Sequence, residues 1–474
     1  MAEAPAFRIR ELELFERPVK LRMPFRFGVV TLTECPQAFA RVQVAFADGG
    51  TSWGAAAELM APKWFDKDLA LSNEDNFGQL RAVLRLARSA YLSDAAPAGA
   101  FGHFARHHDV HQRAAARRGF NPLLASYGPA LIDRALLDAL CRAEGVSFYD
   151  ALRANRPGLG GARPEFAPFD FNGFLASLKP DSTIEARHTV GLLDAISAAD
   201  LGQRLNDGLP ETLEEVIQAY GHRYFKLKVG GQTAADLARL EAIAAVLDRL
   251  PDPYFVSLDG NEQYSHPQGV AELVDGLRAR PALARLWRSI LFIEQPITRA
   301  VALQTDLRAV DLGKPVIIDE SDGELDTFAE ARSRGYAGVS SKTCKGLYKS
   351  FLNAARCAAW NREDPRASYF MSAEDLTTQA GLSVQQDLAL VNLLGIAHVE
   401  RNGHHYVDGM AALPEREQQA FLQAHPDLYT RSHGAVRLKI EAGRIAIGSL
   451  AGAGYASGAL PDFGAMQRLA PAGA

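Results

Sequence analysis

The chain has 474 residues, of which 47% are hydrophobic and 23% are charged, and its formal net charge at pH 7 is −5. This composition is typical of a globular protein of about two domains, and the charge gives no reason to expect nucleic acid or an anionic membrane as a partner. No stretch reaches the roughly 18 apolar residues of a membrane span, and the first residues lack the apolar core of a signal peptide. The four cysteines form no CxxC pair, so we expect reduced thiols and a cytoplasmic protein.

The first 160 residues are predicted to form an α+β domain. Residues 7–21 and 37–50 alternate apolar and polar side chains and end in turn residues, a pattern typical of strands. From Ser72 to Leu152 the apolar spacing becomes helical, most clearly in a stripe that includes Leu131, Leu136 and Leu140. The Gly- and Pro-rich stretch 153–166 is predicted to be a linker.

Residues 161–430 alternate short apolar strands with amphipathic helices. Eight such units predict an α/β protein with a TIM barrel. A doubly wound sheet is the alternative, although no GxGxxG or GxxxxGK[ST] stretch opens any of the helices. Residues 431–474 contain a predicted hairpin, 436–450, which we expect to return to the N-terminal domain. The predicted barrel strands are 186–195, 224–229, 254–261, 289–296, 314–321, 338–345, 367–375 and 394–403.

Three successive predicted strands end in an acidic residue, Asp259, Glu294 and Asp319, and the strands on either side carry Lys228 and Lys342. Barrel strands converge on one mouth at their C-terminal ends, where these carboxylates would repel one another unless a cation lay between them. Mg²⁺ prefers such oxygen ligands and keeps positions for water or substrate. As an alternative, each acidic residue caps the helix that follows its strand.

Two lysines, Lys226 and Lys228, lie two residues apart in one apolar strand and therefore point to the same face. Burial and a like charge lower the pKa of a lysine, whereas nearby carboxylates raise it. A lysine that is partly neutral near pH 7 is suited to proton transfer.

Five short motifs together resemble the signature of the enolase superfamily, most closely its muconate-lactonizing-enzyme branch. They are KLK (226–228), DGN (259–261), EQP (294–296), DES (319–321) and KTCK (342–345). The resemblance implies a modified (β/α)₇β barrel with an N-terminal α+β capping domain that the C-terminal segment completes. It also implies Mg²⁺, with Mn²⁺ as a substitute, held by Asp259, Glu294 and Asp319.

The chemistry that the resemblance implies is removal of the proton α to a carboxylate, which gives an enolate stabilised by the metal. We expect Lys228 to transfer the proton, Lys226 to support it and Lys342 to act from the opposite wall. The product step is left open between racemisation or epimerisation, dehydration and cycloisomerisation. The remaining expected site residues are Asn261, Glu320, Lys345, Glu374, Glu400, Arg26, Thr31 and Trp64, of which Arg26 and Thr31 lie in a stretch, 23–34, that resembles a mobile capping loop.

The chain departs from the family pattern in its cap and in two strands. The acid of the cap motif is displaced to Glu58, the seventh strand carries no histidine and the eighth lacks a DxD stretch, which disfavours a His–Asp dyad and dipeptide epimerisation. His103, His107 and His111 have helical spacing, which we interpret as a solvated helix face or a cap insertion rather than a zinc site. His404 and His405 follow the last strand and are predicted to line the pocket or to form an ordinary polar loop.

Two other functions stay open. A Schiff-base lysine aldolase on a TIM barrel would need no metal, and a non-catalytic barrel would retain the site without using it. For the leading hypothesis the partner is a small carboxylate substrate, and we expect a homo-oligomer, a dimer or a multiple of it.

Overall fold

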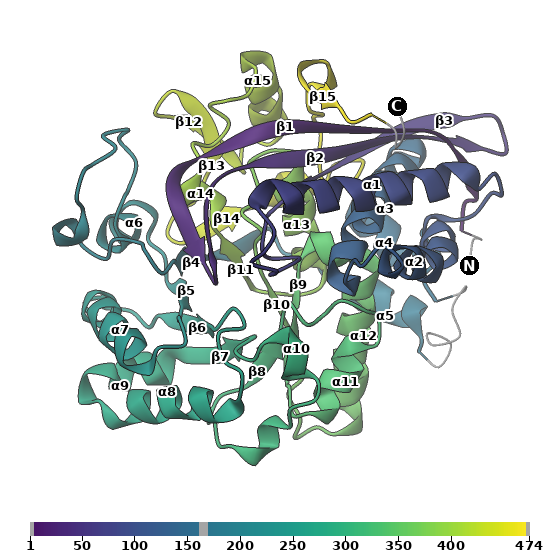
Figure 1. Ribbon diagram of the computed structural model, residues 1–474. Coiled ribbons are helices and arrows are strands. Elements are labelled where there is room, and N and C mark those ends of the chain that lie inside the picture. The colour runs from purple at the N-terminus through teal and green to yellow at the C-terminus, as the bar shows by residue number, and fades with distance from the viewer. Residues whose placement is uncertain (1–3, 161–168, 471–474) are drawn as a thin grey trace.

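The structure is a computed structural model that describes residues 4–160 and 169–470. Figure 1 shows a barrel of short strands and, packed against it, long antiparallel strands with helices. The second part of the predicted linker, residues 161–166, lies outside the described residues. No helix within these described ranges is long and apolar enough to cross a membrane.

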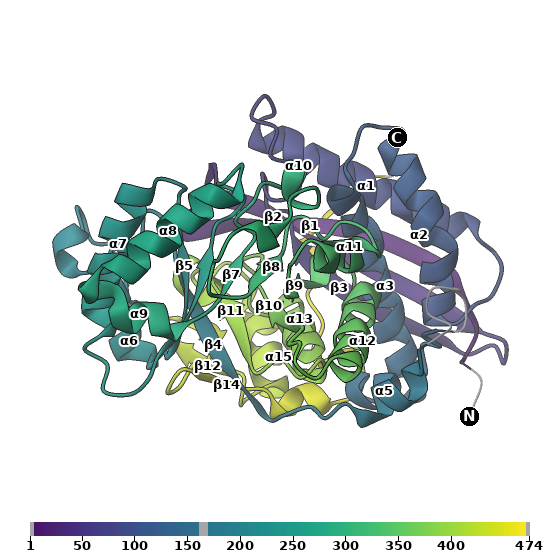
Figure 2. The same cartoon turned by 90° about the horizontal axis from the view of Figure 1, so that it is seen from below.

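The N-terminal domain is a four-stranded antiparallel sheet covered by helices. A turn at Gly28 and Val29 joins the first two strands, and Gly28 adopts a φ of +49° that suits glycine. Figure 2 shows the helices on one face of this sheet. The sheet order is β15 (Gln467–Arg468), β1 (Phe7–Phe27), β2 (Val30–Phe46) and β3 (Thr51–Leu59), and the helices are α1 (Asn73–Ser93), α2 (Ala100–Ala116), α3 (Pro122–Glu144) and α4 (Phe148–Arg153).

Helix α3 is the central element of the N-terminal domain. It begins at Asn121, whose side chain accepts a hydrogen bond from the Leu124 amide, and ends at Gly145 in the left-handed conformation. Every residue from Leu123 to Cys141 is buried, so the helix is enclosed on all sides instead of burying the single stripe that its spacing predicts. The reason is that α3 packs on β3 and also against the barrel.

Eight parallel strands close into the predicted barrel, because β11 pairs with β4. The closed order excludes the doubly wound sheet, and a helix in each crossover gives the (β/α)₇β arrangement. The strands are β4 (Thr183–Val190), β5 (Tyr224–Lys228), β6 (Phe255–Asp259), β7 (Ile290–Glu294), β8 (Val316–Ile318), β9 (Gly338–Ser341), β10 (Phe370–Ala373) and β11 (His398–Arg401). The helices are α5 (Phe171–Ser177), α6 (Leu213–Tyr220), α7 (Thr233–Leu247), α8 (Pro267–Ala279), α9 (Ala284–Ser289), α10 (Arg299–Ala302), α11 (Thr327–Ser333), α12 (Leu347–Glu363) and α13 (Leu382–Leu393).

The C-terminal segment contributes to both parts of the molecule. β15 pairs with β1, with Phe15 opposite Arg468, so the segment returns to the cap sheet as expected. The two strands within the predicted hairpin, 436–450, do not pair with each other. β13 pairs with β12, and β14 pairs with β4, where Ile445 lies opposite Ile184. The elements between β11 and β15 are α14 (Gly403–Tyr406), α15 (Glu415–Ala424), β12 (Tyr429–Ser432), β13 (Ala435–Leu438) and β14 (Arg444–Ala446).

The three histidines of α2 are buried, so the prediction of a solvated helix face is wrong. His103 and His111 contact the backbone carbonyls of Phe7 and Ala125 at 3.0 and 2.9 Å, and His107 lies 3.3 Å from Asp94. Burial lowers the pKa of His103 and of His111 to about 4, which keeps both rings neutral at pH 7. Each ring thus serves the packing of α2 against its neighbours.

The contact between β3 and α3 depends on Gly54. A Cβ at this position would lie 2.2 Å from the carbonyl oxygen of Ala135 and from the amide nitrogen of Ala139. We expect Gly54→Ala to destabilise the protein by about 1–3 kcal/mol in urea unfolding, because sheet and helix must move apart. Gly78→Ala in α1, where a Cβ meets nothing within 4 Å, is the matched control and should be stabilising by about 0.5–1 kcal/mol. Equal effects of the two changes would contradict this packing.

Candidate functional site

Charged side chains from consecutive barrel strands gather at the C-terminal mouth. Strand pairing places Lys228 opposite Asp259, and Asp259 opposite Glu294. Asp319 follows β8 directly and Lys342 follows β9. The structure therefore brings together the residues that end five successive strands.

Lys226 is the centre of this group. Its ammonium group lies 2.9 Å from Asp259, 2.8 Å from Glu294, 2.7 Å from Glu374 and 3.0 Å from Glu400, and its side chain is 1% exposed. Burial lowers the pKa of Lys226, but the four carboxylates together hold that pKa well above its usual value. Of the two opposing effects that the sequence predicts, the attraction of the carboxylates therefore outweighs burial at Lys226.

Lys228 lines the small cavity at the mouth. Its ammonium group donates to Asp259 and, at 2.7 Å, to the side-chain oxygen of Asn261. Asn261 in turn donates to Glu320 at 2.9 Å, so the expected pair Asn261 and Glu320 belongs to the same network. Lys67 from the cap completes it, with an ion pair to Glu320 at 3.8 Å.

Asp319 is held by two lysines of the neighbouring segment. Lys342 donates to one of its carboxylate oxygens, and Lys345 lies 3.2 Å from the other. Burial raises the pKa of Asp319, but Lys342 and Lys345 hold that pKa well below its usual range. The ammonium group of Lys342 also lies 4.3 Å from the centre of the Trp64 ring, a cation–π contact between barrel and cap.

Arg187 and Thr189 on β4 are site residues that the sequence reading missed. Arg187 forms an ion pair with Glu374, and the hydroxyl of Thr189 donates to Glu400 at 2.6 Å. Both point into the barrel because they alternate with the outward residues of β4. The alternation within residues 186–190 was the signal that could have identified them.

The mouth is closed by the cap. The cavity beside Lys228 and Lys342 has a volume of only about 20 Å³, roughly that of one water molecule. Phe25, Phe27 and Trp64 line it, whereas the expected Arg26 is exposed and Thr31, its partner across the hairpin, does not reach the cavity. The cavity's other lining residues are Ala61, Lys226, Asn261, Asp375, Leu376, Thr377, Glu400 and Asn402.

Strand alternation explains why the prediction for the capping loop missed by one residue. Phe25 and Phe27 share one face of β1, and Arg26 lies on the other. The sequence reading favoured the charged residue as a substrate contact, but apolar rings cover the mouth. A substrate larger than water therefore requires the tip of the β1–β2 hairpin to move.

Buried ion pairs attach the cap to the barrel loops. Glu58, the displaced acid of the cap motif, lies 3.0 Å from Arg134 of α3 and accepts a hydrogen bond from Thr343 at 2.8 Å. Thr343 directly follows Lys342, so this contact positions the segment that carries the lysine. Arg299 adds a second attachment by donating to the carbonyl oxygen of Trp64 at 2.7 Å.

Comparisons with known proteins identify the family of the chain. Residues 208–456, more than half of the chain, match the family model described as enolase C-terminal domain-like. The chain belongs to the enolase superfamily. The family match agrees with the resemblance to the muconate-lactonizing-enzyme-like branch, and it makes the chain an enzyme of the isomerase or lyase type. Among curated proteins, none matches.

Solved structures of the superfamily share the fold at low identity. A member from Roseovarius nubinhibens ISM, complexed with magnesium, is 19% identical, with a TM-score of 0.58 over 98% of this chain and 99% of that chain. A muconate lactonizing enzyme from Mycobacterium smegmatis, complexed with muconolactone, is 18% identical, with a TM-score of 0.62 over 98% and 100%. A dipeptide epimerase from Enterococcus faecalis V583, complexed with Mg and L-Leu-L-Tyr, is 15% identical, with a TM-score of 0.60 over 95% and 99%.

The donor atoms at the mouth suit a hard divalent cation. Asp259, Glu294 and Asp319 are fully buried, and both oxygens of Glu294 lie 2.8 Å from the ammonium group of Lys226. Burial, with the charges of Asp259 and Glu374, raises the pKa of Glu294 well above its usual value, so a further cation there would stabilise its carboxylate.

The carboxylate oxygens of Asp259, Glu294 and Asp319 do not converge on one common point. Within the described ranges, two other groups have ligand atoms that all lie within 4.8 Å of one another: His188 with His222 and His404, and Asp94 with His103 and His107. The ammonium group of Lys226 contacts Asp259 and Glu294, whereas Lys342 and Lys345 hold Asp319. Cation binding thus requires these lysines to give up part of their contacts.

Competition between Lys226 and a divalent cation is testable. We expect Lys226→Met to lower thermal stability in metal-free buffer, because removing one partner of a buried pair costs about 3–5 kcal/mol. We also expect Mg²⁺ to raise the melting temperature of this variant more than that of the original chain. Lys349→Met is the matched control, since Lys349 is an equally buried lysine that contacts Asp322 instead. Equal Mg²⁺ responses in both variants would contradict the competition.

Proposed function

We propose that the protein removes the proton α to the carboxylate of a small carboxylic acid in the presence of Mg²⁺. The observation that carries this proposal is the alignment of Lys228, Asp259 and Glu294 on neighbouring strands, with Lys342 on the far side of one small cavity. Lys228 and Lys342 thus border the cavity, and each contacts one of the buried carboxylates, Asp259 and Asp319 respectively.

Asp259, Glu294 and Asp319 would hold the cation, with Mn²⁺ as a substitute. When bound, Mg²⁺ would polarise the substrate carboxylate and stabilise the negative charge that develops as the α-proton leaves. Relatives of the same fold from Roseovarius nubinhibens and Enterococcus faecalis were solved with magnesium, which supports this choice.

Lys228 is proposed as the group that takes the proton. It borders the cavity, and Asp259 and Asn261 hold its ammonium nitrogen in place. A catalytic base must lie within hydrogen-bond reach of the proton it moves, and Lys228 occupies that position for a molecule in the cavity. Lys226 lies among four carboxylates, so its role is to support Lys228 and balance charge.

Lys342 is proposed to act on the opposite face of the α-carbon. Trp64 and Asp319 fix its ammonium group. Racemisation or epimerisation would use both lysines, one removing and the other returning a proton. Dehydration or cycloisomerisation would need one lysine as the base and the other as an acid or as electrostatic support.

Polar residues that contact the lysines and Asp319 are proposed to orient them. Asn261 and Glu320 position Lys228, Lys345 positions Asp319, and Glu374 and Glu400 hold Lys226. A Schiff-base mechanism has less support, because it would leave the three buried carboxylates Asp259, Glu294 and Asp319 without a role.

We also propose a cytoplasmic location, which the four free cysteines support. The proposed partners are a small carboxylate substrate and further copies of the chain.

Solvent deuterium exchange tests the proposed function directly. With Mg²⁺ and a panel of acid sugars, N-acyl amino acids and dipeptides, we expect the chain to exchange the α-proton of at least one compound. Lys228→Ala should lower that exchange by about 100- to 10,000-fold, because the base is lost. Lys226→Ala should lower it by a smaller factor.

The control is Lys349→Met, which removes a buried lysine outside the cavity and should leave exchange unchanged per folded molecule. If α-proton exchange persisted in the Lys228→Ala variant and also in the original chain without Mg²⁺, the proposal would be contradicted. Equal losses in the Lys226 and Lys228 variants would mean that their roles are divided wrongly.

A further inference from the structure

A second group of buried histidines lies outside the barrel mouth. His188 on β4 alternates with the inward Arg187 and Thr189 and therefore points to the outside of the barrel. His222 precedes β5, and His404 belongs to α14. One ring nitrogen from each of the three lies within 4.8 Å of the others. The histidine trio, as we call these residues, thus joins three segments that are distant in sequence.

We propose that the histidine trio binds a divalent transition metal of the Zn²⁺ type. None of the three residues takes part in the proposed α-proton chemistry, so this site is additional to the carboxylate site at the mouth. Imidazole nitrogen suits Zn²⁺, whereas Mg²⁺ prefers oxygen, so the two sites would select different ions.

The spacing of the three rings supports this proposal. In a tetrahedral site with Zn–N bonds of about 2.0–2.1 Å, two ligand nitrogens lie about 3.3 Å apart and their ring centres about 5.2 Å apart. The facing nitrogens Nδ1 of His188 and Nε2 of His404 are 3.2 Å apart. The three distances between ring centres are 5.4, 5.3 and 5.2 Å, so the trio forms a nearly equilateral triangle of the required size.

His222 is oriented as a metal ligand usually is. Its Nδ1 lies 3.0 Å from the carbonyl oxygen of Ala186, which can only accept, so Nδ1 carries the proton. The lone pair is thereby left on Nε2, which is fully buried and has no hydrogen-bond partner in the described part of the chain. A backbone carbonyl that fixes the tautomer of a ligating histidine is the usual outer contact of such sites.

The three rings are also in the protonation state that metal binding needs. Burial lowers the pKa of His222 to about 4, and it lowers the pKa of His188 and of His404 well below their usual range. The imidazoles are therefore neutral at pH 7, and a metal would not have to displace a proton from a charged ring.

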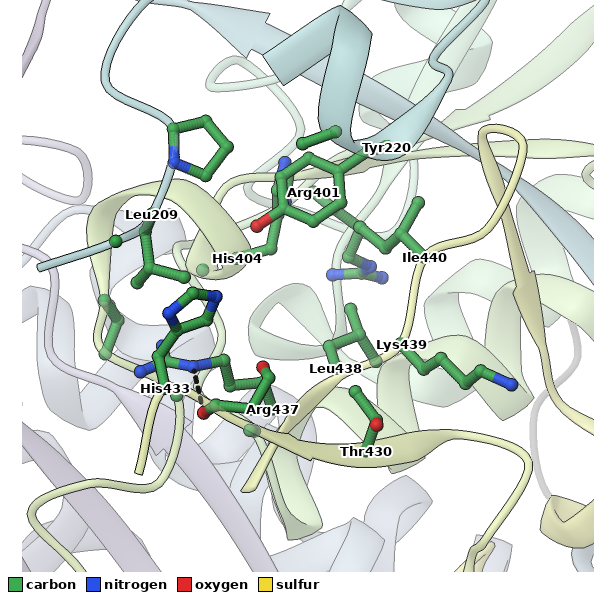
Figure 3. A pocket seen from close by; sticks show the side chains of 18 of the residues that line it. Leu209, Tyr220, Arg401, His404, Thr430, His433, Arg437, Leu438, Lys439 and Ile440 are labelled. Atoms are coloured by element: carbon green, nitrogen blue, oxygen red, sulfur yellow. Dashed lines mark hydrogen bonds between the residues drawn. The ribbon is translucent and has the colours of Figure 1, made fainter. Parts of the chain in front are cut away.

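A large cavity gives access to the trio. It has a volume of about 750 Å³ and lies outside the barrel, between the segment 204–220, α14 and the β12–β13 hairpin. Figure 3 shows His404 and Tyr220 close together on one side of it, with Arg437 and His433 across from them. The Tyr220 ring packs edge-on against both His222 and His404, at 5.7 and 5.2 Å between ring centres. The cavity supplies the entry path and the water that would complete the coordination.

The metal would fasten the point at which the barrel closes. His188 lies opposite Arg401 in the pairing of β4 with β11, and His404 follows three residues later on α14. Binding would thus connect the first and last barrel strands and the loop before β5. We expect this site to act on stability rather than on the proton-transfer step.

Cobalt titration tests the site. The probe is Co²⁺ added to the untagged, metal-stripped full-length chain with Mg²⁺ in excess, because four-coordinate Co²⁺ absorbs visible light strongly and six-coordinate Co²⁺ weakly. We expect one equivalent to give the four-coordinate spectrum and to raise the melting temperature. His222→Gln and His404→Gln should weaken Co²⁺ binding by more than the roughly 10- to 100-fold that changes in outer contacts cost.

Two controls make the outcome decisive. His425→Gln removes a buried histidine elsewhere and should leave Co²⁺ binding unchanged, as should Asp319→Asn at the mouth. His404 is the partly exposed member of the trio, so its variant tests the site even where His222→Gln fails to fold. A six-coordinate spectrum, binding that survives both trio variants, or binding lost in Asp319→Asn would overturn the proposal, and the last outcome would still leave the proposed function intact.

Discussion

Four carboxylates share one ammonium group at the centre of the barrel, and the charged mouth is arranged around that contact. Lys226 lies within 3.0 Å of Asp259, Glu294, Glu374 and Glu400, all of them buried. An uncompensated buried charge is strongly destabilising, so each of these acids needs a cation close by. The short strands meet this constraint because parallel pairing brings their last residues to one level.

The cap belongs to the same electrostatic arrangement. Trp64 covers Lys342, Lys67 pairs with Glu320, and Glu58 connects α3 to the segment after β9. These contacts hold the barrel loops, while Phe25 and Phe27 close the cavity to about the size of a water molecule. The apolar cover and the charged anchors thus come from different segments of the cap, since Phe25 and Phe27 lie on β1 whereas Glu58, Trp64 and Lys67 lie at or after the end of β3.

Much of the fold was predictable because apolar strands alternate with helices over a regular length. The eight barrel strands and the acids at their ends followed from that pattern. The pairing of the tail did not follow from it. β14 pairs with the first residues of β4, ahead of those that pair with β5, and this long-range contact has no local signature. Arg26 is expected to contact substrate, but the alternation of β1 places it on the outer face, and Phe25 and Phe27 line the cavity instead. The histidine trio could not be predicted, since its members meet only when β4 and β11 close the barrel.

Binding of Mn²⁺ followed by electron paramagnetic resonance tests the central claim, that the buried carboxylates at the mouth form a divalent-cation site. Mn²⁺ prefers oxygen ligands as Mg²⁺ does, and its free aqueous signal disappears when it binds. The metal-stripped chain should remove one equivalent of that signal. Asp259→Asn and Glu294→Gln should each restore most of it, whereas His404→Gln should not. Binding that persists unchanged in both carboxylate variants, or no binding to the original chain, would contradict the claim.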